Sequence, residues 1–191
     1  MPTIVPARWT EKGDPLFHLD EMQEMDARSK PPDELHPAEI AEANSAKDSG
    51  NALFKEGKWS EANQEYNRAL RVFSERNGKG AEQRAVKATI SSNKAEALLK
   101  LERWDDALKW ANKAIELDET NGKARFRKAR ALTELDGEAE LEEAAAELRR
   151  LKVANGGAAS KVEQQLAQRV AQKREALRRA HAAGALSLIH I

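Results

Sequence analysis

Apolar and polar residues follow a helical spacing between Ala46 and Leu70. Small residues fall where two helices would approach closely, and large residues fall where a core would be filled. The small positions are Gly50, Ala62 and Ala69, and the large ones are Leu53, Phe54, Trp59, Tyr66 and Leu70. The helical spacing of apolar residues is interrupted around Lys58. The stretch therefore predicts two packed helices joined by a short turn at Lys58.

The same pattern returns twice further along the chain. In the second copy, which starts at Ala88, the matching residues are Ala95, Leu98, Trp104, Ala107, Ala111, Ala114 and Ile115. In the looser third copy, which starts at Gly122, they are Ala129, Leu132, Leu141, Ala144, Leu148 and Leu151, with about three extra residues near Asp136. The second and third copies start 34 residues apart, and the first and second 45 apart. We expect the 11 additional residues to lengthen both helices and the loop around residues 74–80.

A repeat of 34 residues that forms one helical pair is typical of the tetratricopeptide repeat. The sequence thus predicts an all-α fold in which three such repeats, over residues 38–158, form a right-handed helical stack. Residues 159–180 are expected to form a capping helix, because an open-ended stack needs its last repeat covered. Ser160 is the expected N-cap of this helix. The residues near its apolar face are Val162, Leu166, Val170 and Leu177.

The two ends of the chain lack a lasting apolar period. Residues 1–37 contain all six prolines, so we expect an extended or disordered arm. Within the arm, residues 15–26 have apolar side chains at helical spacings, which leaves a short amphipathic turn open as an alternative. Residues 181–191 are expected to be a disordered tail. Its last eight residues, GALSLIHI, look like translated sequencing-adapter sequence; the alternative is a native disordered end.

Composition excludes several classes of function. Among 191 residues, 32 Lys and Arg balance 32 Asp and Glu, so the chain lacks the overall basic field of a nucleic-acid binder. Without cysteine there are no disulfides, thiolate chemistry or cysteine-rich zinc sites. No apolar run reaches 18 residues, and residues 1–10 do not resemble a secretory signal. These features favour a soluble, non-exported protein, for which we expect a cytoplasmic location.

No constellation of residues indicates catalysis, a metal or a cofactor. The four histidines lie far apart near the two ends, no serine stands in a nucleophile motif, and no glycine-rich loop follows a strand. Basic residues between Arg149 and Arg179 could attract an acidic partner, but a solvated capping helix explains them more simply. The sequence predicts a binding module without catalytic residues.

Polar residues on the first helix of each pair are the candidates for ligand binding, since these helices line the concave groove of such a stack. Lys47 and Asn51 share a helix face, Asn93 follows on the next first helix, and Lys123 and Arg127 share a face on the third. These five positions offer hydrogen-bond donors and include no acidic residue. Such a set favours carboxylates, and an extended peptide ending in aspartate supplies two on one residue.

The segments AKDSGN, SSNK and GKARFRKA resemble the carboxylate-clamp motifs of co-chaperone tetratricopeptide domains. This resemblance covers residues 39–155, and the long insertion after the first repeat is similar to that of immunophilins with a tetratricopeptide tail. It implies a partner: the C-terminal Glu-Glu-Val-Asp of the seventy- or ninety-kilodalton heat-shock chaperones. It also implies that Lys47, Asn51 and Asn93 hold the terminal aspartate, while Lys123 and Arg127 contact the peptide backbone and upstream acidic residues.

Two alternatives stay open from the sequence. Immunophilins join such a module to a prolyl isomerase domain of about a hundred residues, so the chain could be a fragment of an enzyme of that class; only some 37 residues precede the repeats here. The groove could also be a scaffold for another peptide. Phe54 could form the floor of a pocket for the valine of the peptide, although core packing is the simpler interpretation.

Overall fold

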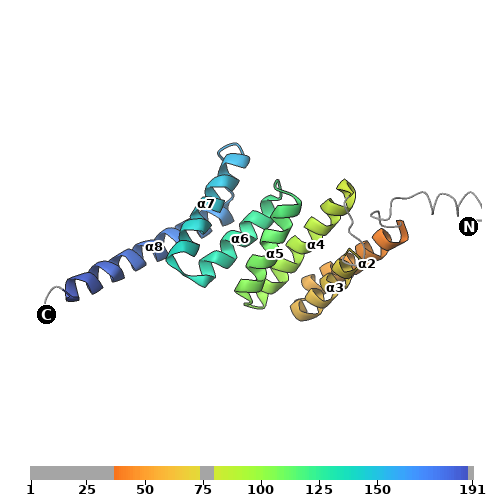
Figure 1. The fold of residues 1–191 in the computed structure, drawn as a ribbon, viewed down its shortest axis with the longest axis horizontal. Coiled ribbons are helices and arrows are strands. Elements are labelled where there is room, and N and C mark those ends of the chain that lie inside the picture. Colours follow the sequence, from red (N-terminus) through yellow and green to blue (C-terminus); the bar gives the residue numbers. More distant parts are fainter. Residues whose placement is uncertain (1–36, 74–79, 189–191) are drawn as a thin grey trace, which may run out of the picture.

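The computed structural model describes residues 37–73 and 80–188. Within these ranges the chain forms seven α-helices and no strand. They are α2 (Pro37–Lys55), α3 (Trp59–Val72), α4 (Ala81–Lys100), α5 (Trp104–Leu117), α6 (Gly122–Leu135), α7 (Glu138–Ala154) and α8 (Lys161–Leu188). Successive helical pairs lie side by side along the long axis of the molecule (Figure 1). The prediction of an all-α stack is confirmed.

The helices form two layers. In one layer α2 contacts α4, α4 contacts α6, and α6 contacts α8. The helices of the other layer, α3, α5 and α7, each pack against the helices before and after them in the chain. Side chains of α2, α4 and α6 that point away from the second layer therefore share one surface.

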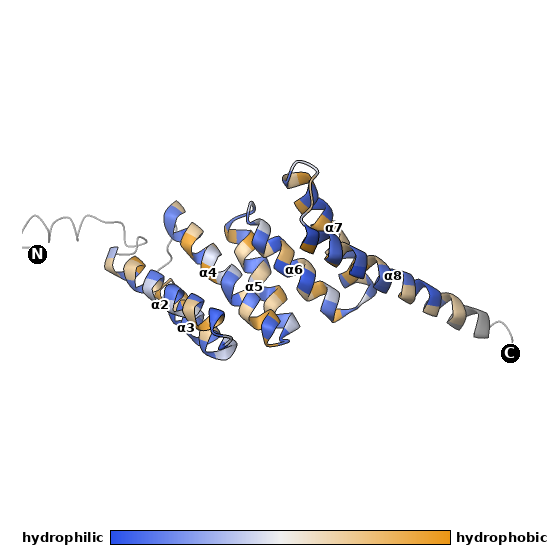
Figure 2. Ribbon diagram, turned by 180° about the vertical axis from the view of Figure 1, so that it is seen from behind, coloured by the Kyte–Doolittle hydropathy of each residue, from blue (hydrophilic) through white to orange (hydrophobic). Residues whose placement is uncertain are grey.

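The core is divided among the helical pairs, and small residues allow the close approach of the helices. Ala62, Ala69 and Tyr66 of α3 are at most 1% exposed and pack with α2 and α4. Ala107, Ala111 and Ala114 have the same role on α5. Along each helix hydrophobic and hydrophilic residues alternate, as amphipathic packing requires (Figure 2).

One residue predicted to fill the core lies largely outside it. The side chain of Trp59 is 36% exposed, because Trp59 is the first residue of α3 and stands at the edge of the turn. Its ring instead lies 5.9 Å from the ammonium of Lys100.

The turns inside the three pairs share one backbone feature, a residue with positive φ. These residues are Gly57 (φ 79°), Glu102 (φ 57°) and Asp136 (φ 62°), and they recur at the spacings of the repeats. Glu138, the first residue of α7, likewise lies 34 residues after Trp104, the first residue of α5. The prediction of about three extra residues near Asp136 is therefore wrong. Instead α7 is longer than α5, with 17 residues against 14.

The insertion between the first two repeats also differs from its prediction. Helix α3 has 14 residues, the same number as α5, so the insertion does not lengthen it. Helix α4 has 20 residues and begins at Ala81, ahead of Ala88 where the repeat pattern starts. The rest of the insertion lies between α3 and α4.

The capping helix α8 covers the last repeat as expected. Ser160 caps it: the backbone N–H of Glu163 donates to Ser160 Oγ (3.3 Å), and the backbone N–H of Ser160 donates to Glu163 Oε2 (2.7 Å). Leu166 and Val170 are buried against α6 and α7. Val162, which was expected on the same face, is 57% exposed in the first turn.

The structure describes most of the predicted C-terminal tail but only the last residue of the predicted N-terminal arm. Helix α8 continues to Leu188, whereas the sequence placed its end at Ala180; the alanines at 180, 182, 183 and 185 favour this extension. The predicted arm, apart from Pro37, and the last three residues of the predicted tail lie outside the described ranges. Pro37 is the first residue of α2, a position that suits proline.

Candidate functional site

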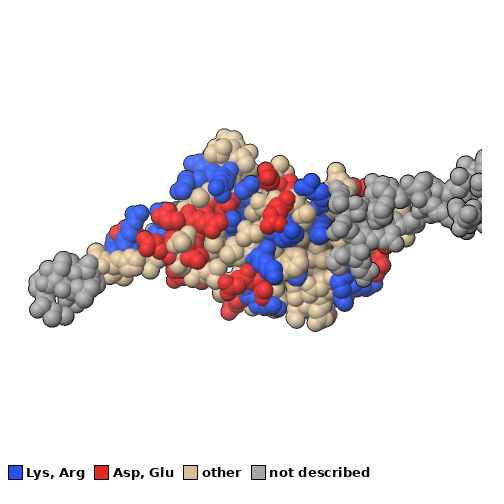
Figure 3. All heavy atoms as spheres, in the orientation of Figure 1, with Lys and Arg blue, Asp and Glu red and all other residues tan. Residues whose placement is uncertain are grey.

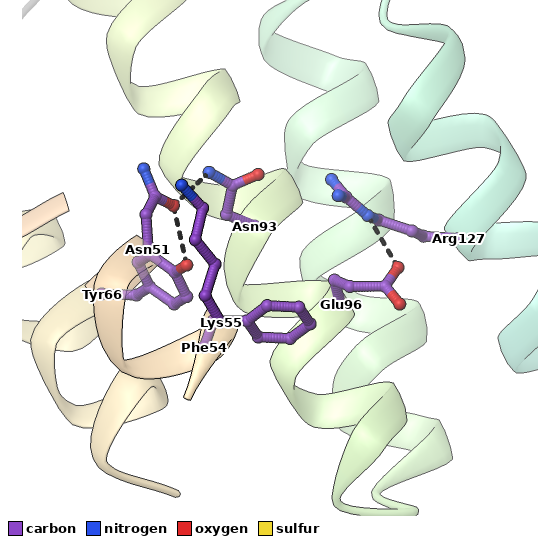
Figure 4. Close-up of a pocket in the computed structure, with 7 residues that line it drawn as sticks. All are labelled: Asn51, Phe54, Lys55, Tyr66, Asn93, Glu96 and Arg127. Atoms are coloured by element: carbon purple, nitrogen blue, oxygen red, sulfur yellow. Dashed lines mark hydrogen bonds and ion pairs between the residues drawn. The ribbon is translucent and has the colours of Figure 1, made fainter. Parts of the chain in front are cut away.

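Helices α2, α4 and α6 together line a cavity of about 200 Å³ on their shared surface. Its lining residues are Asn51, Phe54, Lys55, Tyr66, Asn93, Glu96 and Arg127 (Figure 4). Three of the five predicted residues, Asn51, Asn93 and Arg127, are thus brought together from three helices. On α6 the register is fixed by Asn121, whose side-chain Oδ1 accepts a hydrogen bond from the backbone N–H of Ala124 (3.0 Å).

The two asparagines form a hydrogen-bonded pair. Asn51 Oδ1 accepts hydrogen bonds from Asn93 Nδ2 (3.0 Å) and from the hydroxyl of Tyr66 (2.9 Å). Because both bonds use its oxygen, the amide nitrogen of Asn51 keeps its N–H donors for a ligand. The arrangement presents donors at this end of the cavity.

Tyr66 supports this pair from the layer behind it. Its ring packs against Gly50, where an added Cβ would lie 2.6 Å from Tyr66 Cε1. Burial raises the pKa of Tyr66 to about 12, so its hydroxyl remains a donor at neutral pH. The sequence had placed Tyr66 and Gly50 only in the core; the structure shows that they also orient Asn51.

Arg127 is held by a carboxylate that sequence reasoning missed. Its Nε donates to Glu96 Oε2 (3.0 Å), and its Nη1 donates to the hydroxyl of Ser92. Glu96 Oε1 accepts a second bond from Arg130 Nη1 (2.7 Å). The cavity therefore contains an acidic residue, although none occurs among the five predicted positions.

Lys123 lines a second cavity, of about 340 Å³, which continues from the first. Glu96 and Arg127 line both cavities, so the two form one groove. The far wall of the second cavity is built by Ser160, Val162 and Glu163 at the start of α8. This position explains the exposure of Val162: its side chain faces the groove instead of the core.

Lys47 lies outside the lining of both cavities. It stands one helical turn before Asn51, and its Nζ donates to Asn44 Oδ1 (2.9 Å) and lies 3.5 Å from Asp48 Oδ1. The main partner is neutral and Asp48 is 70% exposed, so the charge of Lys47 is little compensated.

Lys55 is a further cation that sequence reasoning missed. It lines the first cavity, one turn after Asn51, and its side chain extends along the side where the asparagines lie (Figure 4). The spacing of four residues from Asn51, and the spacing of three between Asn93 and Glu96, could have placed both residues in the groove. Neither belongs to the recognised motif, so neither was considered.

Phe54 belongs both to the cavity and to the core. Its half-buried ring lines the first cavity and also packs against the core formed by α2, α3 and α4. It offers apolar surface beside the donors of Asn51.

The described part of the chain has further cavities away from this groove, one between α7 and α8 and one at the end of α7. Basic and acidic side chains are interspersed on the face drawn in Figure 3. Among residues 37–73 and 80–188 there is no cluster of three metal-ligating side chains, and no helix is long and apolar enough to cross a membrane.

Comparisons with known proteins agree with the helical architecture. The family model for the tetratricopeptide repeat matches residues 88–121. The tetratricopeptide domain of Arabidopsis OM64 superposes with a TM-score of 0.58 at 28% identity, covering 69% of this chain and 96% of that domain. The fold is a tetratricopeptide stack. It resembles the modules of co-chaperones.

Two further solved tetratricopeptide domains are similar and contain bound peptides. The second domain of human RPAP3, in complex with the HSP70 peptide SGPTIEEVD, is 29% identical, with a TM-score of 0.57 over 69% of this chain and 97% of that one. The TPR2B domain of yeast Sti1, in a complex with an Hsp70 peptide, is 27% identical, with a TM-score of 0.59 over 70% and 99%.

Curated relatives match through part of their length. The chain is 34% identical over 108 residues to the mitochondrial import receptor subunit TOM70 of Rattus norvegicus, which is 56% of this chain and 17% of that protein. It is 36% identical over 126 residues to the peptidyl-prolyl cis-trans isomerase FKBP42 of Arabidopsis thaliana, 63% of this chain and 34% of that protein. The tetratricopeptide module is thus shared with much longer proteins.

Proposed function

We propose that the groove across α2, α4 and α6 is a carboxylate clamp that binds the acidic C-terminus of a heat-shock chaperone, and that the protein acts as a co-chaperone or adaptor. The observation that carries the proposal is the convergence of Asn51, Asn93 and Arg127 in one cavity, with Lys55 beside them. Donors and cations gathered on a concave surface suit carboxylate groups.

In this proposal Asn51, Asn93 and Lys47 hold the two carboxylates of a terminal aspartate, with Lys55 as an additional cation. Arg127 and Lys123 lie further along the groove and contact the peptide backbone and upstream acidic side chains. Phe54 provides an apolar surface for the residue before the aspartate. The groove runs across three helices, so the ligand is an extended chain.

The peptides bound by similar domains support the choice of partner. The RPAP3 and Sti1 domains, both above 25% identity to this chain, are in complexes with Hsp70 peptides. We extend the proposal to tails of the ninety-kilodalton chaperones, which share the Glu-Glu-Val-Asp end. The matched module is a protein-interaction module, so we propose an adaptor without isomerase activity of its own. We also propose that the protein is located in the cytoplasm.

Titration of the purified chain with the peptide SGPTIEEVD tests the proposal. We expect a dissociation constant around 1 μM, about 8 kcal/mol, and weaker binding as salt rises. The control is the same peptide with an amidated C-terminus, which lacks one carboxylate charge. It should bind about ten- to a hundredfold more weakly. Equal binding of the two forms would show that the groove does not recognise a terminal carboxylate.

A further inference from the structure

Glu96 occupies the middle of the groove. Its carboxylate lines both cavities, and its side chain is 18% exposed. Each of its oxygens has one arginine partner: Arg127 on Oε2 and Arg130 on Oε1. Arg127 and Arg130 therefore share a single counterion.

This sharing changes the charge that a ligand meets. Two guanidinium groups and one carboxylate carry a net charge of one, so part of the charge of Arg127 is already compensated. Burial alone would raise the pKa of the Glu96 carboxyl, but the charges and hydrogen bonds of Arg130 and Arg127 bring it below its usual value. The carboxylate is therefore ionised at neutral pH.

The two ends of the groove differ from its middle. At one end Asn51, Asn93 and Lys55 line the first cavity without a carboxylate of their own. In the second cavity Lys123 stands beside Glu163, whose Oε2 accepts the N–H of Ser160. A bound acidic peptide thus meets donors without an ion pair at its C-terminal residue. Where its middle residues lie, it meets arginine charge that Glu96 already compensates in part.

We propose, on the basis of the function proposed above, that Glu96 determines specificity by disfavouring carboxylates at the middle positions of the bound peptide. The contacts of Arg127 and Lys123 with upstream acidic side chains then add little affinity, because Glu96 already compensates part of the arginine charge, and the groove obtains most of its affinity from the terminal residue. Ligands with neutral residues before a terminal aspartate bind nearly as well as ligands with glutamates there.

Two peptides and three variants test this proposal. The peptides are SGPTIEEVD and SGPTIQQVD, which differ only in the charge of two middle residues. The wild-type chain should bind them with similar affinities. Glu96→Gln retains the size and one acceptor of the side chain, and it should increase the preference for SGPTIEEVD by about three- to tenfold, since a like charge is removed at short range. The matched control is Glu116→Gln, which removes the same charge from an exposed position on α5 and should leave the preference unchanged.

Arg130→Gln provides the opposite change. It leaves Glu96 with one arginine, so the net charge of the cluster falls from plus one to zero and the preference should shift toward SGPTIQQVD. If Glu96→Gln weakens both peptides equally, Glu96 only holds Arg127 in place, and the proposal is wrong. An unchanged preference in a chain that still binds SGPTIEEVD also overturns it, while the proposed function stands. Absence of any binding to the wild-type chain rejects the function itself.

Discussion

The groove and the seam between α8 and the last repeat use the same basic residue types in different ways. In the seam each cation has its own acid: Arg169 pairs with Glu134 at 2.7 Å, Lys173 Nζ lies 3.1 Å from Asp136 Oδ1, and Arg174 pairs with Glu142. In the groove, Arg127 shares Glu96 with Arg130, and Lys55 and Lys123 have no ion pair with any residue of the described ranges. Charge pairing, and not charge content, separates the attachment of a helix from the capacity to bind a ligand.

Exchanging one arginine in each region should give the largest contrast. Arg127→Ala removes a donor to the peptide and leaves the Glu96 carboxylate with one arginine, so it should weaken SGPTIEEVD by about ten- to a hundredfold, or 1.5–3 kcal/mol. Arg169→Ala removes an arginine of the seam and should leave the affinity within about twofold, because its charge is screened. Calorimetric titration of both variants measures the difference. Equal losses would mean that only the total charge of the chain matters.

Gly50→Ala should disturb the support behind the groove. The added Cβ would lie 2.6 Å from the ring of Tyr66, so we expect a loss of about 1–3 kcal/mol in the free energy of unfolding and weaker peptide binding. The matched control is Gly122→Ala, whose Cβ would meet only Leu151 Cδ2 at 3.4 Å. Urea unfolding followed by circular dichroism compares the two. A Gly50 variant as stable as the Gly122 variant would show that Tyr66 moves aside without cost.

Tyr66→Phe should have a smaller effect that is specific to binding. It removes the hydroxyl that donates to Asn51 Oδ1 and retains the ring, so the affinity for the peptide should fall by about two- to tenfold, or 0.5–1.5 kcal/mol. Fluorescence anisotropy with a labelled peptide measures this change. An unaltered affinity would indicate that the bond from Asn93 is enough to orient Asn51.

The seam pairs should contribute least. A double-mutant cycle on Arg169 and Glu134, read by urea unfolding, should give a coupling of about 0.2–1 kcal/mol that decreases with salt, since both side chains are partly exposed. Peptide binding should not change in any member of the cycle. A coupling above this range would mean that the seam is desolvated more strongly than its exposure indicates.

The helical stack could be predicted because its determinants are local. Small residues such as Ala62 and Ala107 recur at fixed spacing, and Ser160 followed by Glu163 forms a capping box within one turn. The length changes could not be placed from this pattern alone. Leu148 of α7 can be matched to more than one residue of α5 when the repeats are aligned. The left-handed backbone of Asp136 fixes this alignment, because Glu102 has the same conformation in the preceding repeat.

The site was less accessible to sequence reasoning, since its contacts join residues far apart in the chain. Asn93 bonds to Asn51 across 42 positions, and Arg127 bonds to Glu96 across 31. The motif pointed to Asn51, Asn93, Lys123 and Arg127, which line the groove, and to Lys47, which does not. It carried no information about Glu96 or Lys55, which reach the groove through helix geometry. The role of the five motif residues in peptide binding stays a prediction that the experiments above address.

The layer contacts bear on how the protein unfolds. Each helix contacts its sequence neighbours, and α2, α4 and α6 each also contact the next member of their own layer. No contact joins α2 directly to α6 or α8 in the described ranges. Such a stack behaves as a one-dimensional chain of units, in which the ends open more easily than the centre and amide exchange proceeds fastest there. A peptide bound across α2, α4 and α6 would bridge units that are otherwise joined only through their neighbours. Binding would then slow exchange in all three helices together and make the first helical pair unfold with the rest.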